Sequence, residues 1–227
     1  MNKLLKNNNE FIPLLIVSLV FIYINIFESC IRDYFWGSVI NDILIGVIVS
    51  YIFYLIVVYI PSRKKEAIIK SNYKRQITAF KSSIISKLLQ SMSGGYIGEE
   101  GWKHEDLFIN KNFKDFFHTK VSKTQDRWDQ IATNLQDDIG RINDIVMEFK
   151  ILEDESRFVL NNLEIKDERI YVFLKRVSKI TYSLRSYNPD TDDINHIMLF
   201  LWQIFAGWSW VDGYSDKDIF QIIYDEF

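Results

Sequence analysis

Three histidines are the side chains in this sequence best suited to hold a metal ion or to move protons. They are His104, His118 and His196, and no two of them have the three- or four-residue spacing that places two ligands on one helix face. His104 lies beside Glu105 and Asp106 in the stretch KHED. Metal-dependent hydrolases of the His-Asp kind need further histidine and aspartate ligands from other helices, and only two other histidines exist. The sequence therefore predicts no metal site.

Motifs for nucleophiles, phosphate and calcium are missing as well. Cys30 is the only cysteine, which excludes an internal disulfide bond and a zinc site built from cysteines. The stretch SGGYIGEEG at 93–101 is not followed by Gly-Lys-Ser/Thr, so it predicts a hinge and not a phosphate loop. The stretch NPDTDD at 188–193 lacks the glycine and the final glutamate of a calcium loop, and its carboxylates suit a helix start. We expect no catalytic residue, no cofactor and no enzyme.

Charge divides the chain into three parts. Residues 1–62 carry three Lys or Arg and four Asp or Glu, residues 63–90 carry eight and one, and residues 91–227 carry 16 and 25. An apolar head is thus followed by a basic neck and an acidic body. The acidic body argues against a direct nucleic-acid site.

The apolar head contains two stretches suited to a lipid bilayer. Residues 11–27 and 43–62 carry no formal charge, and about 20 apolar residues suffice to cross the hydrocarbon core. We predict a transmembrane hairpin at 1–62, with spans at about 11–27 and 40–60. A cleaved signal peptide is less favoured because no small-x-small cleavage site follows the first stretch.

The lysine and arginine distribution predicts the orientation of this hairpin. Lys3 and Lys6 precede the first span, and the connecting loop contains a single basic residue, Arg32. Six cations follow the second span, and we expect them to lie at the membrane surface against anionic lipid: Arg63, Lys64, Lys65, Lys70, Lys74 and Arg75. Because cytoplasmic loops carry the excess of positive charge, both termini should be cytoplasmic in a multi-pass protein of the bacterial inner membrane.

A few small or polar residues share faces within the predicted spans. Ser18 and Asn25 are seven residues apart, and Gly46, Ser50 and Tyr54 follow one another at four-residue intervals. Gly46 and Ser50 fit small-xxx-small packing. These faces predict either packing of the two spans within one chain or contacts between chains that line a channel.

The neck at 63–92 has the periodicity of an amphipathic helix. Its apolar residues recur every three or four positions, at Ile69, Tyr73, Ile77, Phe80, Ile84 and Leu88. Two compatible interpretations stay open: the helix lies on anionic lipid, or its apolar face packs on the cytoplasmic domain. Pro61 should stand in the first turn of this helix or break it from the span.

The body at 102–227 reads as an acidic all-α domain beyond the hinge at 93–101. A heptad-like stripe from Trp128 to Phe149 predicts one long helix, either in an ordinary bundle, which is favoured, or in a coiled coil, with the QDD stretch on its solvent side. A second helix should bury Ile170, Phe173, Leu174, Val177 and Leu184, with Ile180 or Thr181. The 14 uncharged residues at 194–207 are short for a third span and predict a buried helix. Ser215 and Asp218 resemble a capping box before a short terminal helix.

Aromatic side chains gather near the end of this body. Phe200, Trp202, Phe205, Trp208 and Trp210 fall within eleven residues. We expect a core position for this cluster, and a docking surface is the alternative if it is exposed.

Two short spans, a basic neck and a helical cytoplasmic domain without an active site resemble a known layout. It is that of the small two-transmembrane effectors of bacterial anti-phage defence, including the retron-associated type. The resemblance covers the whole chain and lies in its organisation, with no residue motif. It implies a dormant membrane toxin that is released or oligomerised on infection and then permeabilises the inner membrane. Its cytoplasmic domain would bind a protein partner or self-associate. The alternatives are a membrane-anchored scaffold and, less favoured, an enzyme with a dispersed site.

Overall fold

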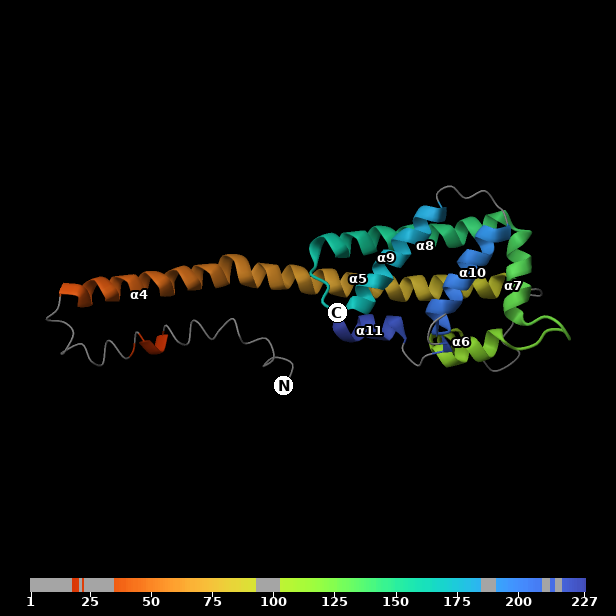
Figure 1. Ribbon diagram of the computed structural model, residues 1–227, viewed down its shortest axis with the longest axis horizontal. Coiled ribbons are helices and arrows are strands. Elements are labelled where there is room, and N and C mark those ends of the chain that lie inside the picture. Colours follow the sequence, from red (N-terminus) through yellow and green to blue (C-terminus); the bar gives the residue numbers. More distant parts are fainter. Residues whose placement is uncertain are drawn as a thin grey trace. The chain divides into compact units, whose positions relative to one another are not determined.

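The described part of the chain is almost entirely helical (Figure 1). The computed structural model describes residues 18–20, 22, 35–92, 103–184, 191–209, 213–214 and 218–227. Two short strands, β1 (Trp208–Ser209) and β2 (Gly213–Tyr214), pair antiparallel. The prediction of an all-α fold is confirmed at this level.

Several sequence predictions fall on residues outside the described part. They concern most of the first span at 11–27, its polar residue Asn25 and the hinge at 93–101. Within the first span, Ser18–Val20 and Ile22 are helical. The two-helix hairpin as a whole stays a prediction.

The chain divides into two compact units, Met1–Lys65 and Glu66–Phe227. We call the first the apolar unit and the second the helical domain. The apolar unit contains α4 (Phe35–Tyr54), the π-helical turn η2 (Leu55–Tyr59) and the beginning of α5 (Ile60–Gln90).

Pro61 lies in the first turn of α5, as one of the two sequence expectations had it. Proline lacks an N–H donor, and its ring clashes with the carbonyl four residues earlier, at Val57. The preceding turn is widened: the Ile60 N–H donates to the Leu55 carbonyl, five residues back. This π-helical turn lets the helix accommodate the proline without ending.

Helix α5 supplies the centre of the helical domain. Its buried side chains recur on one face, at Ile69, Tyr73, Ile77, Phe80, Lys81, Ile84, Ile85, Leu88 and Leu89. The predicted apolar face of the neck is therefore buried in the domain, which bears out the packing interpretation. The sequence predicted a neck separate from the domain, but the helix at these residues is part of the domain's core.

Helix α8 (Ile139–Asn162) runs antiparallel to α5, as contacts between early residues of one helix and late residues of the other establish (Figure 1). Tyr73 meets Ser156 across a 2.9 Å hydrogen bond, and the rings of Phe80 and Phe149 lie 5.4 Å apart. Lys87 binds Glu148 at 3.0 Å. The two helices thereby share one interface over several turns.

The prediction of one long helix from Trp128 to Phe149 is wrong. The chain forms α7 (Arg127–Gln136) and α8, which are separated at Asp137 and Asp138. Asp138 accepts a hydrogen bond from the Arg141 N–H and so caps the start of α8. A capping aspartate favours a new helix start over continuation, and this local preference overrides the apolar stripe.

The remaining helices complete the domain. They are the 3₁₀ turn η3 (His104–Phe108), α6 (Asn110–Phe117), α9 (Glu168–Ser183), α10 (Thr191–Phe205) and α11 (Ile219–Glu226). Helix α9 buries the predicted face and uses Thr181 in place of Ile180. Asp218, and not the predicted Ser215, is the N-cap of α11; Ser215 itself lies outside the described residues.

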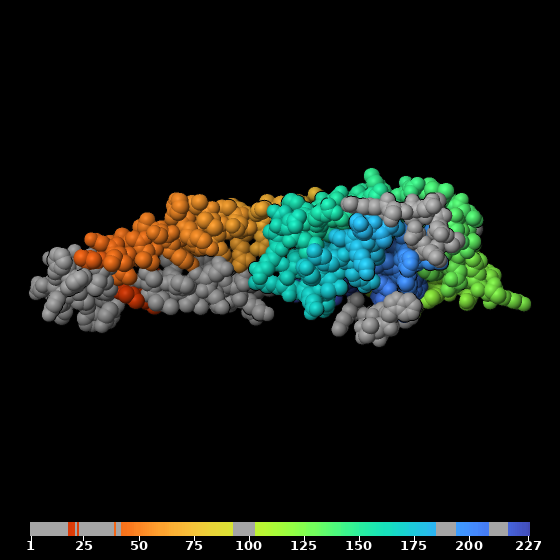
Figure 2. All heavy atoms as spheres, turned by 45° about the horizontal axis from the view of Figure 1, so that its top comes forward, coloured from red at the N-terminus to blue at the C-terminus, as the bar shows by residue number. Residues whose placement is uncertain are grey.

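Aromatic packing joins α10 to the rest of the core. Phe200, Trp202 and Phe205 are buried, as expected, and Trp208 packs partly buried against them; Trp210 lies outside the described residues. The Phe205 ring lies 5.2 Å from Phe113 of α6 and 5.5 Å from Phe220 of α11. Figure 2 shows one face of this domain, where atoms of α8 and α9, teal to light blue, reach the surface.

Candidate functional site

The apolar unit presents hydrocarbon side chains on its outside. Residues from Asp42 onward contain an 18-residue window with a mean hydropathy of 2.7, none of it buried within the chain. Ile43, Val49, Phe53 and Ile56 are 59–65% exposed. By length and composition this helix can cross a membrane, and it is the one such helix among the described residues. A helix that is apolar on all sides is poorly suited to water.

Three predicted face residues lie on α4, and a fourth in a short helical stretch. Gly46, Ser50 and Tyr54 belong to α4 and are exposed, and Ser18 is helical. At Gly46, a methyl group would meet nothing within 4 Å in the described chain. Among the described residues, Ser18 included, none makes a close contact with this position.

Arg63, Lys64 and Lys65 lie in the first two turns of α5, shortly after η2 ends at Tyr59. Arg63 folds back on Tyr59: its Nε donates to the phenol oxygen at 3.3 Å, and its guanidinium lies 5.3 Å from the ring centre. Lys64 and Lys65 are exposed. An arginine stacked on a tyrosine at the end of an apolar helix suits the layer where membrane meets water.

The other three predicted surface cations belong to the helical domain and make contacts inside it. Lys70 pairs with Glu66 at 2.7 Å, and Arg75 donates to Asn72 at 3.3 Å. Lys74 donates to the Tyr224 carbonyl at 2.7 Å, at the end of α11. The six cations therefore form two groups, and in the second group Lys74 joins α5 to α11.

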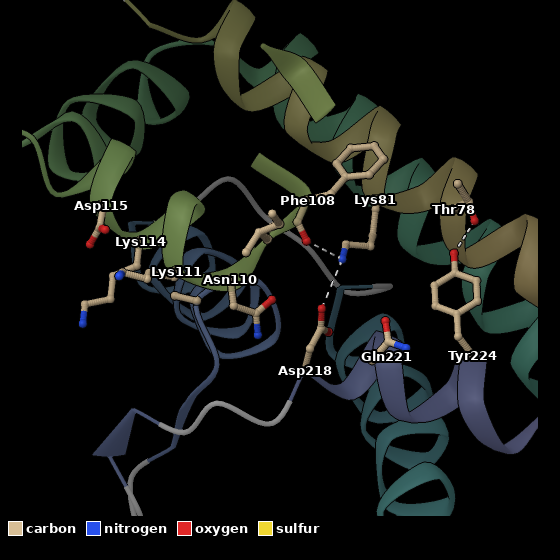
Figure 3. Close-up of a pocket in the computed structure, with 12 residues that line it drawn as sticks. Thr78, Lys81, Phe108, Asn110, Lys111, Lys114, Asp115, Asp218, Gln221 and Tyr224 are labelled. Carbon is tan, nitrogen blue, oxygen red and sulfur yellow. Dashed lines mark hydrogen bonds and ion pairs between the residues drawn. The ribbon is translucent and has the colours of Figure 1, made fainter. Parts of the chain in front are cut away.

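A buried lysine, Lys81, is the polar feature that sequence reasoning missed (Figure 3). Its side chain is 7% exposed, and its ammonium donates to the Phe108 carbonyl at 2.9 Å and to Asp218 at 3.5 Å. The Phe220 ring lies 4.6 Å from the same ammonium. Lys81 shares the apolar face of the neck with Ile77, Ile84 and Ile85, and this position could have predicted from sequence that the lysine is buried.

Asp218 receives hydrogen bonds from three elements. Its Oδ1 accepts from the Phe220 N–H at 2.8 Å, and its Oδ2 accepts from Lys81. The Asn110 amide, with its nitrogen turned toward the acceptors, donates to the same Oδ2 at 3.2 Å and to the Phe205 carbonyl at 3.1 Å. This cluster ties α5, α6 and α11 together.

Burial disfavours the charged form of Lys81. Loss of hydration lowers the pKa of the Lys81 ammonium, and the nearby Asp218 carboxylate partly opposes this shift. The ion pair therefore offsets a cost that the buried position imposes on the charged form.

A pocket of about 780 Å³ opens beside this cluster (Figure 3). The Thr78 hydroxyl and the Tyr224 phenol oxygen are hydrogen-bonded to each other at one side of it. Other lining residues come from η3, α6 and α11 and from the chain around them: Phe108, Ile109, Asn110, Lys111, Lys114, Asp115, Ala206, Asp218 and Gln221. The pocket lies wholly within the helical domain.

Two of the three histidines lie within hydrogen-bond distance of other groups of the domain, and the third is exposed. His104 Nε2 lies 3.2 Å from the Ser82 carbonyl, His118 Nδ1 lies 3.0 Å from Asp126 Oδ2, and His196 is exposed. Among the described residues, no three His, Cys, Asp or Glu side chains come together in a way that could hold a metal ion. The His118 contact supports Asp126, which is the N-cap of α7.

No family model matches this chain, and comparison with curated proteins and with solved structures found no similar protein.

Proposed function

We propose that this protein is a membrane-embedded effector of bacterial anti-phage defence that permeabilises the inner membrane when its helical domain is released or triggered. The observation that carries the proposal is the apolar helix of α4 and η2, whose side chains are unburied and which is followed, after three further residues, by Arg63, Lys64 and Lys65. Such a helix prefers lipid to water. The exposed face of Gly46, Ser50 and Tyr54 would meet other copies and line a pore.

Control of this activity is assigned to the helical domain. Helix α5 begins in the apolar unit at Ile60, and its residues from Ile69 onward form the domain core. A partner that binds one arrangement of the domain more tightly than another would shift the balance between dormant and active states. The lipid contacts of Arg63, Lys64 and Lys65, and both cytoplasmic termini, belong to the same proposal.

The test uses the apolar unit, residues 1–65, produced in bacterial cells beside the full chain. A longer fragment ending after α5 would expose the apolar face of α5 from Ile69 to Leu89 and aggregate. We expect residues 1–65 to collapse the membrane potential, measured with a voltage-sensitive dye. The full chain should do so less, because its helical domain holds it dormant.

Single substitutions then test the pore face. Ser50→Leu and Asn25→Leu should abolish depolarisation by residues 1–65 while membrane insertion is kept. Val49→Leu, an exposed neighbour on α4, should leave depolarisation unchanged. Retained depolarisation in Ser50→Leu would rule out the pore assignment.

A membrane-anchored scaffold is the second candidate. It is favoured by exposed apolar side chains on α8 and α9, where Met147 is 57%, Phe158 49% and Tyr182 73% exposed. Such side chains are typical of surfaces that bind a protein partner. An intact membrane potential in cells whose membranes contain residues 1–65 would favour the scaffold over the effector.

A further inference from the structure

The pocket beside Lys81 has the size of a small-molecule site. Its volume of about 780 Å³ falls in the range of roughly 300–1,000 Å³ that is usual for ligand pockets. Its walls come from α5, α6 and α11, which are tied together below it by Lys81, Asp218 and Asn110. A site built on three mutually bonded helices is held in a fixed shape.

The lining favours a negatively charged ligand. Among the described lining residues there are three lysines, Lys81, Lys111 and Lys114, and two aspartates. One of these, Asp218, is already held by Lys81, Asn110 and the Phe220 N–H. The other, Asp115, is exposed. Lys111 and Lys114 lie on the wall formed by α6.

Helix α6 adds to this positive field. Its N-cap position holds Ile109, whose side chain accepts no hydrogen bond, and its first turn has no acidic residue. Lys111 lies in the first turn, near the positive end of the helix dipole, where its charge is unfavourable for the helix, whereas Lys114 lies in the last turn. An anion bound in the pocket would offset the charge of Lys111 and the missing side-chain cap.

The pocket also offers apolar surface. Ile109 is 58% exposed, and its neighbour Phe108 is partly buried. Tyr224, on α11, is also partly buried and lines the pocket from another side (Figure 3). An aromatic side chain and an exposed isoleucine suit a flat organic group. A ligand with one anionic end and one flat end would use both parts of the lining.

We propose that this pocket binds a phosphate-bearing small molecule of mononucleotide size, with the phosphate on Lys111 and Lys114 and the buried Lys81 fixing the floor. The site would add ligand control to the helical domain. It does not depend on membrane permeabilisation, so it stands or falls separately from the proposed function.

The test is calorimetric titration of the full chain in nanodiscs of zwitterionic lipid. The probes are ATP, inorganic pyrophosphate and adenosine. ATP and pyrophosphate should bind, and binding should weaken with added salt. No binding of either phosphate probe, or equal binding of adenosine and ATP, would overturn the proposal.

Variants locate the site. Lys111→Ala/Lys114→Ala should weaken ATP binding by roughly tenfold or more, because two charge-assisted contacts to the phosphate are lost. Lys150→Ala/Lys179→Ala removes the same charge from exposed positions on α8 and α9 and should change nothing. Equal weakening by both double variants would contradict a specific site.

A lipid headgroup is the other source of phosphate. Nanodiscs that contain phosphatidylglycerol should leave ATP affinity unchanged if the ligand is a soluble molecule. If these discs compete with ATP in the unsubstituted protein but not in Lys111→Ala/Lys114→Ala, the same site takes its phosphate from lipid.

Discussion

At the scale of single residues, buried polar groups distinguish this domain from a purely apolar bundle. Tyr73 is fully buried, and its phenol shares a 2.9 Å hydrogen bond with the buried Ser156 hydroxyl. The apolar face of α5 was predictable because its residues recur at helical spacing. The partner of Tyr73 was not, because it lies 83 residues away on another helix.

The Tyr73 and Ser156 pair predicts a strongly non-additive double-mutant cycle. Tyr73→Phe alone should lower the free energy of unfolding by about 1–3 kcal/mol, because Ser156 is left buried without its partner. Adding Ser156→Ala to that variant should recover most of the loss. Urea denaturation of residues 66–227 measures both, and simple additivity would show that the hydrogen bond contributes little.

Tyr73 also predicts a loss of stability at alkaline pH. Burial raises the pKa of its phenol far above the ordinary value of 10.0. A group whose pKa is raised by folding contributes its full stability below the unfolded-state pKa and loses it as pH rises further. The free energy of unfolding should therefore fall above pH 10 relative to Tyr73→Phe. The unsubstituted protein and Tyr73→Phe both contain Lys81, so the contribution of Lys81 to the pH dependence largely cancels in the comparison. Parallel pH profiles would contradict the assignment.

At the scale of elements, helix starts were the least predictable feature. The stripe from Trp128 to Phe149 has helical spacing throughout, yet the helix is interrupted at Asp137 and Asp138. Apolar spacing reports which face is buried, whereas a capping aspartate reports where a helix begins. The two signals conflict here, and the local one determines the structure.

The α8 cap predicts a measurable effect. Asp138→Ala removes the acceptor for the Arg141 N–H and should lower the free energy of unfolding by about 0.5–2 kcal/mol. Asp144→Ala, an exposed aspartate on the same helix, should change it by less than about 0.5 kcal/mol. Chemical denaturation of both variants makes the comparison; equal values would show that Asp138 is no more than a surface charge.

At the scale of the whole molecule, the sequence indicated the apolar segment and the helical body. It predicted that the body begins at residue 102, whereas the compact helical unit begins at Glu66. Residues 63–92 read as a neck because their cations dominate the composition. Their apolar face is nonetheless the centre of the helical domain, which begins at Glu66. The Lys81 pocket could not be predicted from the sequence either, because its walls come from three segments that are far apart along the chain.

This boundary predicts which fragment folds. Residues 66–227 should unfold cooperatively in urea, because they contain every buried core residue of the described chain. Residues 102–227 lack α5 and with it Tyr73, Phe80 and Ile84, and should show no cooperative transition. Cooperative unfolding of residues 102–227 would show that α5 is dispensable.

The central claim is that the apolar unit is held in lipid, and alkaline carbonate extraction of bacterial membranes tests it most directly. The full chain is compared with residues 66–227, each with the same affinity tag at Phe227. The full chain should stay in the membrane pellet while residues 66–227 appear in the soluble fraction. Release of the full chain into the supernatant by carbonate would contradict both the effector and the anchored scaffold.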